Sequence, residues 1–195
     1  MNEKVAYGIA EALVSLGIVT RATGCAKITQ TNKGFDLTDR VVYIATGEGQ
    51  AVCDTDAKLF SFLPNSKEKA IAYFEDKGVT VKDFGSTFQK WTGALKLFVW
   101  INTKLIDPAN PVGTKRKIFD SIPLTIQTDS IIRAAKMKRV KMYGTDEKPY
   151  QGCNLDEKNK HFLTSPHDYL VVDLEYTIIT TKDCLPTLEQ NPVIC

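Results

Sequence analysis

The stretch GALKLFVWINTKLI, residues 93–106, alternates apolar and polar side chains as a half-buried β-strand does. One face forms an unbroken apolar row, which predicts contact with a core: Leu95, Leu97, Val99 and Ile101. The other face should meet water, yet it carries Phe98 and Trp100 between lysines. We therefore expect a second sheet layer or a neighbouring subunit to cover Phe98 and Trp100.

The composition is that of an ordinary soluble globular protein, with 43% hydrophobic and 25% charged residues in a chain of 195. This length suits one domain with a core of its own. The formal net charge of +2 creates no global field that would favour nucleic acid or a membrane surface. We expect a single domain over residues 1–181.

Cysteine usage and the first residues bear on the compartment. Five cysteines form no CxxC pair, and their odd number favours neither a disulfide framework nor a zinc site. A reducing compartment is the simpler interpretation. The opening MNEKVAYGIAEALVSLGIVT is interrupted by Glu3 and Glu11, and its apolar run is too short for a bilayer. No membrane partner is expected.

The first third of the chain predicts a helix followed by two strands. Apolar residues at helical spacing predict a helix over residues 2–16, with Asn2 as its cap and Gly17 as its stop. Residues 18–31 and 40–46 are rich in Val, Ile and Thr. They predict an antiparallel strand pair.

The middle of the chain leads into the opening strand. Residues 66–78 predict a short helix, because Ser66 can cap it and Gly78 can end it. Residues 79–91 predict a strand with a kink at Gly85. Prolines then stop the strand that begins at residue 93.

The last third predicts helices, a long loop and a closing strand. Residues 114–143 predict a helix in two pieces broken at Pro123, and residues 144–168 form a polar excursion too long for a simple connection. The stretch 168–181 alternates well. Its expected core face consists of Leu170, Val172, Leu174, Tyr176 and Ile178.

This order of elements lacks the repeated βαβ alternation of a parallel sheet. We therefore expect an α+β fold with a mainly antiparallel mixed sheet, an N-terminal helix and helices packed on one face. Residues 182–195 combine two prolines with apolar side chains, which is unusual for a free terminus. We expect an extended C-terminal arm that lies along another subunit through Leu185, Leu188, Val193 and Ile194.

No motif indicates catalysis, a cofactor or a metal. The stretch GEGQA, residues 47–51, lacks the third glycine and the following helix of a dinucleotide loop. The stretch NPVGTKRK, residues 110–117, lacks P-loop spacing. His161, His167 and Asp168 have no metal-binding spacing. We expect no cofactor, no metal and no enzymatic activity.

A basic segment follows the break at Pro123 and is expected on the second helical piece. It could be a solvated face, a contact with an acidic partner subunit, or a contact with nucleic acid. We favour the protein partner, because the overall charge is small. The residues expected at subunit interfaces are Phe98, Trp100, Arg133, Lys136, Lys138, Arg139, Leu185, Leu188, Val193 and Ile194.

The layout resembles the ring-forming neck and tail-terminator proteins of tailed bacteriophages, including those of crAss-like phages. The resemblance is carried by the early helix EKVAYGIAEALVSL, a small mixed sheet, the expected late helix SIIRAAKMKRV and the closing strand YLVVDLEYTII. It implies a homo-oligomeric ring in the virion, assembled in the host cytoplasm. Other neck or tail proteins would be partners, and DNA would pass through the lumen without sequence readout.

An alternative of a different class stays open at this point. A chain of this size and composition also suits a small soluble enzyme or ligand-binding α+β domain. Neighbouring genes for a portal, a major capsid protein or a tail tube would separate the two classes.

Overall fold

The computed structural model describes residues 2–33, 36–45, 66–126, 135–143 and 165–181. The elements in chain order are α1 (Asn2–Ser15), β1 (Arg21–Lys33), β2 (Asp36–Ala45), β3 (Ala70–Phe84), β4 (Phe88–Asn102), α2 (Thr103–Ile106), α3 (Pro111–Asp120), β5 (Thr125–Ile126), β6 (Ala135–Tyr143) and β7 (His167–Thr181). The predicted loop over 144–168 lies outside the described residues up to residue 164, and the predicted arm over 182–195 lies outside them entirely.

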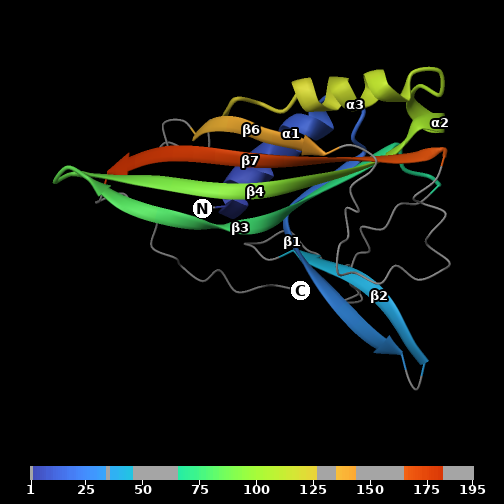
Figure 1. The fold of residues 1–195 in the computed structure, drawn as a ribbon, viewed down its shortest axis with the longest axis horizontal. Helices are drawn as coiled ribbons and strands as arrows, with labels where there is room; N and C mark the ends of the chain where they lie inside the picture. Colours follow the sequence, from blue (N-terminus) through green and yellow to red (C-terminus); the bar gives the residue numbers. More distant parts are fainter. Residues whose placement is uncertain (1, 34–35, 46–65, 127–134, 144–164, 182–195) are drawn as a thin grey trace.

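Seven strands form one sheet in the order β2-β1-β3-β4-β7-β6-β5 (Figure 1). The β1–β3 pair is parallel, and the other neighbouring strands run antiparallel. Side chains of α1 and α3 share one hydrophobic cluster with the same face of the central strands. The expected α+β fold, with a mainly antiparallel mixed sheet and helices on one face, is confirmed.

Helix α1 forms where the sequence predicts it and covers the centre of the sheet. Val5, Ile9 and Leu13 recur four residues apart and are fully buried. The helix ends at a glycine, because Gly17 adopts a positive φ of 70° and its N–H donates to Val14 O. Asn2, expected as a cap, is instead the first helical residue.

We call the face of the sheet that packs against α1 the helix face. Its central row is the predicted apolar face of β4, and the predicted face of β7 lies beside it in the same cluster. The register joins Leu97 to Val172 and Val99 to Leu170. Alternation in two long paired strands therefore places one continuous core under the helix.

The short helix predicted over 66–78 is wrong. Residues from Ala70 onward form β3, which pairs with β4 in the register Phe74↔Leu97. The run AIAYF is apolar throughout and gives no period, so the Ser66 and Gly78 signals decided the prediction. Both faces of this run are buried in the sheet, which explains why it lacks alternation.

The kink predicted at Gly85 is the turn of the β3–β4 hairpin. Gly85 has a positive φ of 71°, which favours glycine, and β4 returns from Phe88. The hairpin is long: its far end extends past the other elements at the left of Figure 1. Strand β4 ends at Asn102, and the short helix α2 begins at the next residue.

The two-piece helix predicted over 114–143 is half correct. Its first piece is α3, which begins earlier than expected because Asn110 accepts from the Gly113 N–H and Pro111 occupies the first turn. The predicted second piece is wrong. Its described parts are the short strand β5 and strand β6, which is antiparallel to β7. Two of its lysines, Lys138 and Lys141, lie opposite acidic residues of β7, a pairing that favours a strand.

The predicted antiparallel pair of early strands is confirmed as β1 and β2. The start of β1 runs parallel to β3, with Arg21 opposite Ile71 and Cys25 opposite Phe74. Beyond Cys25 the strand pairs with β2, from Ala26↔Ala45 onward. Figure 1 shows this two-stranded ribbon leaving the main sheet at the lower right.

Candidate interaction surfaces

Phe98 and Trp100 lie on the sheet face opposite α1, which we call the aromatic face. Both are 3% exposed within a single chain. The Tyr73 ring stacks on Phe98 with a centroid distance of 5.0 Å and an interplanar angle of 7°. Trp100 and Tyr169 meet at 5.9 Å in a tilted arrangement. The expected burial of these two rings is present in one chain, and their place at a subunit interface stays a prediction.

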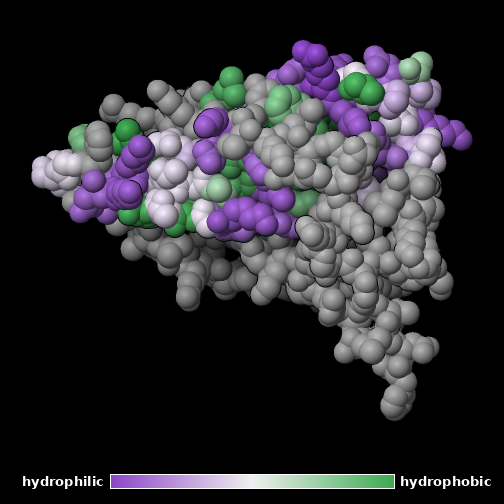
Figure 2. Space-filling model, in the orientation of Figure 1, coloured by the Kyte–Doolittle hydropathy of each residue, from purple (hydrophilic) through white to green (hydrophobic). Residues whose placement is uncertain are grey.

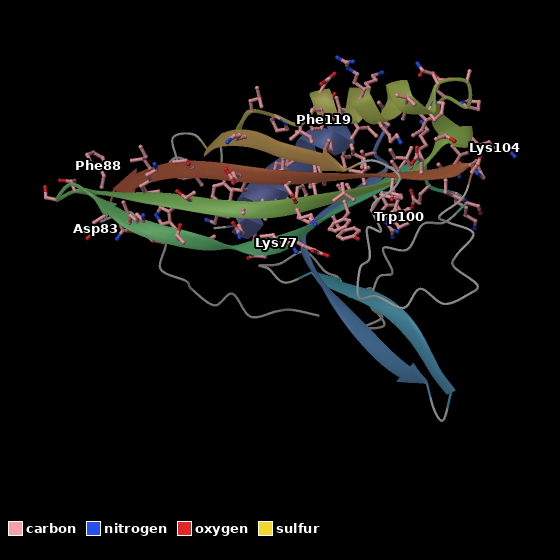
Figure 3. The ribbon with its side chains drawn as sticks, in the orientation of Figure 1. Lys77, Asp83, Phe88, Trp100, Lys104 and Phe119 are labelled. Atoms are coloured by element: carbon pink, nitrogen blue, oxygen red, sulfur yellow. The ribbon has the colours of Figure 1, made fainter. Side chains whose placement is uncertain are left out.

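The strand register explains how the aromatic face is built. Tyr73, Phe98 and Val171 lie in one row across three strands. Ile71, Trp100 and Tyr169 form the next row. Such rows place aromatic and β-branched side chains within contact distance. Phe119 of α3 packs against the helix-face cluster, which does not include Trp100 (Figure 3 labels both residues). The sheet therefore separates two apolar layers.

The aromatic face becomes charged towards the hairpin end. Glu75, Lys96 and Asp173 occupy one row, and the Lys96 ammonium lies 6.0 Å from the centre of the Phe98 ring. In the following row Lys138 is opposite Glu175. Opposite charges directly across a strand pair attract, so these two rows are largely self-neutralising.

The structure places the predicted basic residues on a strand beside β7. Lys138 is exposed. The register puts Lys136 opposite Thr177 and Arg139 opposite Leu174. Arg133 lies outside the described residues, as do all four apolar residues predicted for the arm: Leu185, Leu188, Val193 and Ile194. Nothing in the described part therefore brings the arm and the basic segment together.

A polar cluster under the first turn of α1 was not predicted. The Asn2 side chain donates to Asp76 and to Gly78 O, the latter at 3.3 Å, and accepts from the Tyr176 hydroxyl. The Tyr176 ring lies over Gly93, where any Cβ would overlap it. Burial raises the pKa of the Tyr176 hydroxyl, so this group stays a neutral donor. The only sequence signal was a glycine within an otherwise regular strand.

Glu3 makes a second contact between α1 and the sheet. Its carboxylate accepts from the Cys25 N–H at 2.9 Å and occupies the space that a side chain at Gly24 would need. Burial raises the pKa of the Glu3 carboxyl and of the Cys25 thiol. A thiol held protonated is a poor nucleophile, so this pair positions the helix and is not suited to catalysis.

The far end of the β3–β4 hairpin exposes both apolar and basic side chains. Phe88 is 44% and Ile179 48% exposed. The register puts Lys82 opposite Lys90, and Lys90 opposite Ile179. Within the described residues neither lysine has an ion-pair partner. We call Lys82, Phe88, Lys90 and Ile179 the hairpin tip (Figure 3 labels Phe88).

Asp168, considered for a metal site, and the two nearby acidic residues of β7 all lie against lysines. Asp168 forms an ion pair with Lys115 of α3 at 2.8 Å. Asp173 and Glu175 face the lysines of neighbouring strands. Over the described ranges, no three His, Cys, Asp or Glu side chains gather where they could hold a metal ion. No helix in that same part of the chain is both long and apolar enough to cross a membrane.

The fold and these surfaces define a class: an α+β protein whose mainly antiparallel mixed sheet is covered by an N-terminal helix on one face and extended by long hairpins. Neither the protein-family models nor the curated proteins contain a match to the chain.

Proposed function

We propose that this chain is a structural virion protein of a tailed phage. Copies of it form an oligomeric ring in the head–tail connector or tail and join neighbouring rings around the DNA channel. The proposal rests on three parts of the resemblance in layout, the N-terminal helix, the mixed sheet and the closing strand, and on the way two hairpins extend beyond the helix-covered core. The late helix of that layout gives no support, because its described part is strand β6.

The β1–β2 ribbon is the strongest structural support for the proposal. It leaves the sheet after Cys25 and continues as two strands, which pair with each other up to Lys33↔Asp36. An isolated two-stranded hairpin is marginally stable in water, and a third strand or a packed surface is needed to hold it. A ribbon of this length suits a subunit that reaches onto a neighbour.

The core supports the same role, because it is anchored at several points. Helix α1 is tied to β1 through Glu3 and to β3 and β7 through Asn2. Helix α3 is tied to β7 through the Lys115–Asp168 ion pair. A firmly packed body with projecting strands is suited to transmitting mechanical force between subunits.

The test is self-assembly of the purified full-length chain. Light scattering coupled to size exclusion should give a mass that is a fixed multiple of the 21.7 kDa chain. A second part of the test is to examine whether genes for a portal, a major capsid protein or a tail tube lie beside the gene for this chain.

A folded monomer at every concentration, together with metabolic neighbouring genes, would contradict the proposal. That pair of results would favour the small enzyme or ligand-binding domain instead. A stable oligomer beside virion genes would support the ring.

A further inference from the structure

We propose that copies of this chain associate head to tail, with the hairpin tip of one copy docked on the exposed end of α1 in the next. This inference deepens the proposed assembly role and rests on it. It names the two surfaces that would make the contact between subunits.

The hairpin tip carries positive charge that no acidic residue in the described part of the chain neutralises. Lys82 and Lys90 lie directly opposite each other, and like charges at such positions destabilise a strand pair. No carboxylate among the described residues pairs with either of them. Phe88 and Ile179 on the same face are nearly half exposed. This surface is suited to an anionic partner that also offers apolar contact.

The apolar part of the tip argues for protein over nucleic acid. A phosphate backbone would engage the lysines but would leave Phe88 and Ile179 without an apolar partner. A protein surface with a carboxylate beside aliphatic side chains engages both parts.

The end of α1 offers the complementary features. Glu11 is exposed and has no ion pair among the described residues, and Val14 one turn later is 41% exposed. Leu16 is exposed just beyond the helix. The last turn of α1 contains no basic residue, so the negative end of the helix dipole is uncompensated. We call Glu11, Val14 and Leu16 the α1 end.

The two surfaces cannot meet within one copy. Thr20, shortly after α1, donates to the Ala70 carbonyl at the start of β3. The hairpin tip lies at the other end of β3, and 15 residues of strand span on the order of 45 Å. In Figure 1 the tip is at the left, whereas β3 begins at the right. Any contact between the tip and the α1 end therefore joins two copies.

A contact between two different surfaces is heterologous. After one such contact, one copy still has a free α1 end and the other a free hairpin tip, so the contact can repeat and gives a ring if the rotation closes. Figure 2 shows green apolar atoms beside purple polar atoms at the left end of the molecule, where the tip lies. The head-to-tail arrangement thus supplies the repeating contact that a ring requires.

The experiment is a charge swap in the full-length chain. The tip variant carries Lys82→Glu and Lys90→Glu, and the helix variant carries Glu11→Lys. In either variant alone, the tip of one copy and the α1 end of the next carry charges of the same sign. The affinity between copies should therefore fall about tenfold or more relative to the parent, as measured by sedimentation velocity. Mixed one to one, the two variants should regain assembly, because every contact between unlike variants is again complementary.

A matched control separates this effect from a general change in charge. Lys104 of α2 is exposed at the opposite end of the sheet from the tip (Figure 3). Lys104→Glu makes the same charge reversal as each of the two substitutions in the tip variant and should assemble like the parent. Circular dichroism melting of all variants verifies that each is folded.

Each result decides something different. If the parent assembles and the separate variants assemble equally well, the named surfaces are wrong while the proposed ring stands. If the variants are monomeric but their mixture stays monomeric, the tip docks on something other than α1, and the inference is overturned. If the parent is monomeric at all concentrations, the proposed function fails first and this contact fails with it.

Discussion

Two neighbouring residues in the first turn of α1 attach the helix to the sheet by different chemistry. Asn2, whose own side chain does not ionise, accepts from the Tyr176 hydroxyl and donates to the Asp76 carboxyl group. Glu3 brings an ionisable carboxyl group into a half-buried position against the Cys25 N–H. The Glu3 contact therefore depends on the protonation state of the helix residue itself.

Glu3 is expected to make the fold less stable as the pH rises. Burial raises the pKa of its carboxyl above the ordinary value of 4.5, so the folded state binds the proton more tightly than the unfolded state. That contribution is fully present below the unfolded pKa and is lost as the pH rises through the folded pKa. Glu3→Gln keeps an acceptor for Cys25 and removes the ionisation. Relative to the parent, the variant should therefore gain stability in urea denaturation as the pH rises above the ordinary carboxyl pKa of 4.5.

A Glu3→Gln difference from the parent that stays flat as the pH rises would mean that the carboxyl is not buried as described.

Trp100 is expected to stabilise the single chain. It is buried against Tyr169 without any partner subunit. Trp100→Ala should lower the free energy of unfolding by about 3–5 kcal/mol, the usual loss for a buried large aromatic. Chemical denaturation at two protein concentrations tests this, because a loss within the chain does not depend on concentration. A normal unfolding free energy with weaker assembly would place Trp100 at a subunit interface instead.

At the scale of elements, alternation predicted the strands that have one consistent core face. The β4 face of Leu95, Leu97 and Val99 and the matching face of β7 follow directly from period-two patterning. Strand β3 was missed because the run from Ala70 to Phe74 is buried on both faces and has no period. Strand β6 was missed because its lysines balance acids of β7, a long-range pairing that no local pattern contains.

The surfaces were less predictable than the fold. The aromatic side chain of Phe98 on a face that also carries lysines predicted that Phe98 is buried. The side chains that bury it include Tyr73, which comes from a segment expected to be helical. The hairpin tip could not be foreseen, because its cross-strand lysine pair exists only once β3 is a strand. The polar cluster around Asn2 joins residues more than 70 positions apart, and its register follows only from the folded sheet.

The lysine pair at the hairpin tip should limit the stability of its own hairpin. Lys82→Glu alone replaces a like-charged pair with an opposite-charged pair across β3 and β4. We expect a gain of about 0.2–1 kcal/mol in the free energy of unfolding, measured by urea denaturation at low salt. Lys77→Glu is a suitable contrast, because Lys77 already forms an ion pair with Glu75. This variant should lower the free energy of unfolding. No gain for Lys82→Glu would show that the two lysines do not oppose each other as the register requires.

At the scale of the whole molecule, charge is distributed so that duplex DNA should bind weakly. The net charge is +2, and Lys96 and Lys138 lie opposite acidic residues of β7. Phosphate contacts would give a steep dependence on salt, with a slope of roughly 0.9 per phosphate neutralised. We expect only weak binding at physiological salt in fluorescence anisotropy. Submicromolar affinity that falls steeply with salt and disappears in Lys138→Glu would instead identify strand β6 as a nucleic-acid surface.

The proposed ring depends on projecting parts attached to an anchored body. The β1–β2 ribbon and the β3–β4 hairpin extend away from the core in different directions (Figure 1). Surfaces that point apart suit contacts with different neighbours, one within a ring and one between stacked rings. This arrangement leaves the helix-covered core unchanged while the extensions engage their partners.

Negative-stain electron microscopy of the purified full-length chain tests the central claim most directly. The account predicts closed rings of uniform size, with a central opening wide enough for duplex DNA, that fall apart in the tip variant of Lys82 and Lys90. A field of single folded particles, unchanged at the highest concentration at which the protein stays soluble, would contradict it.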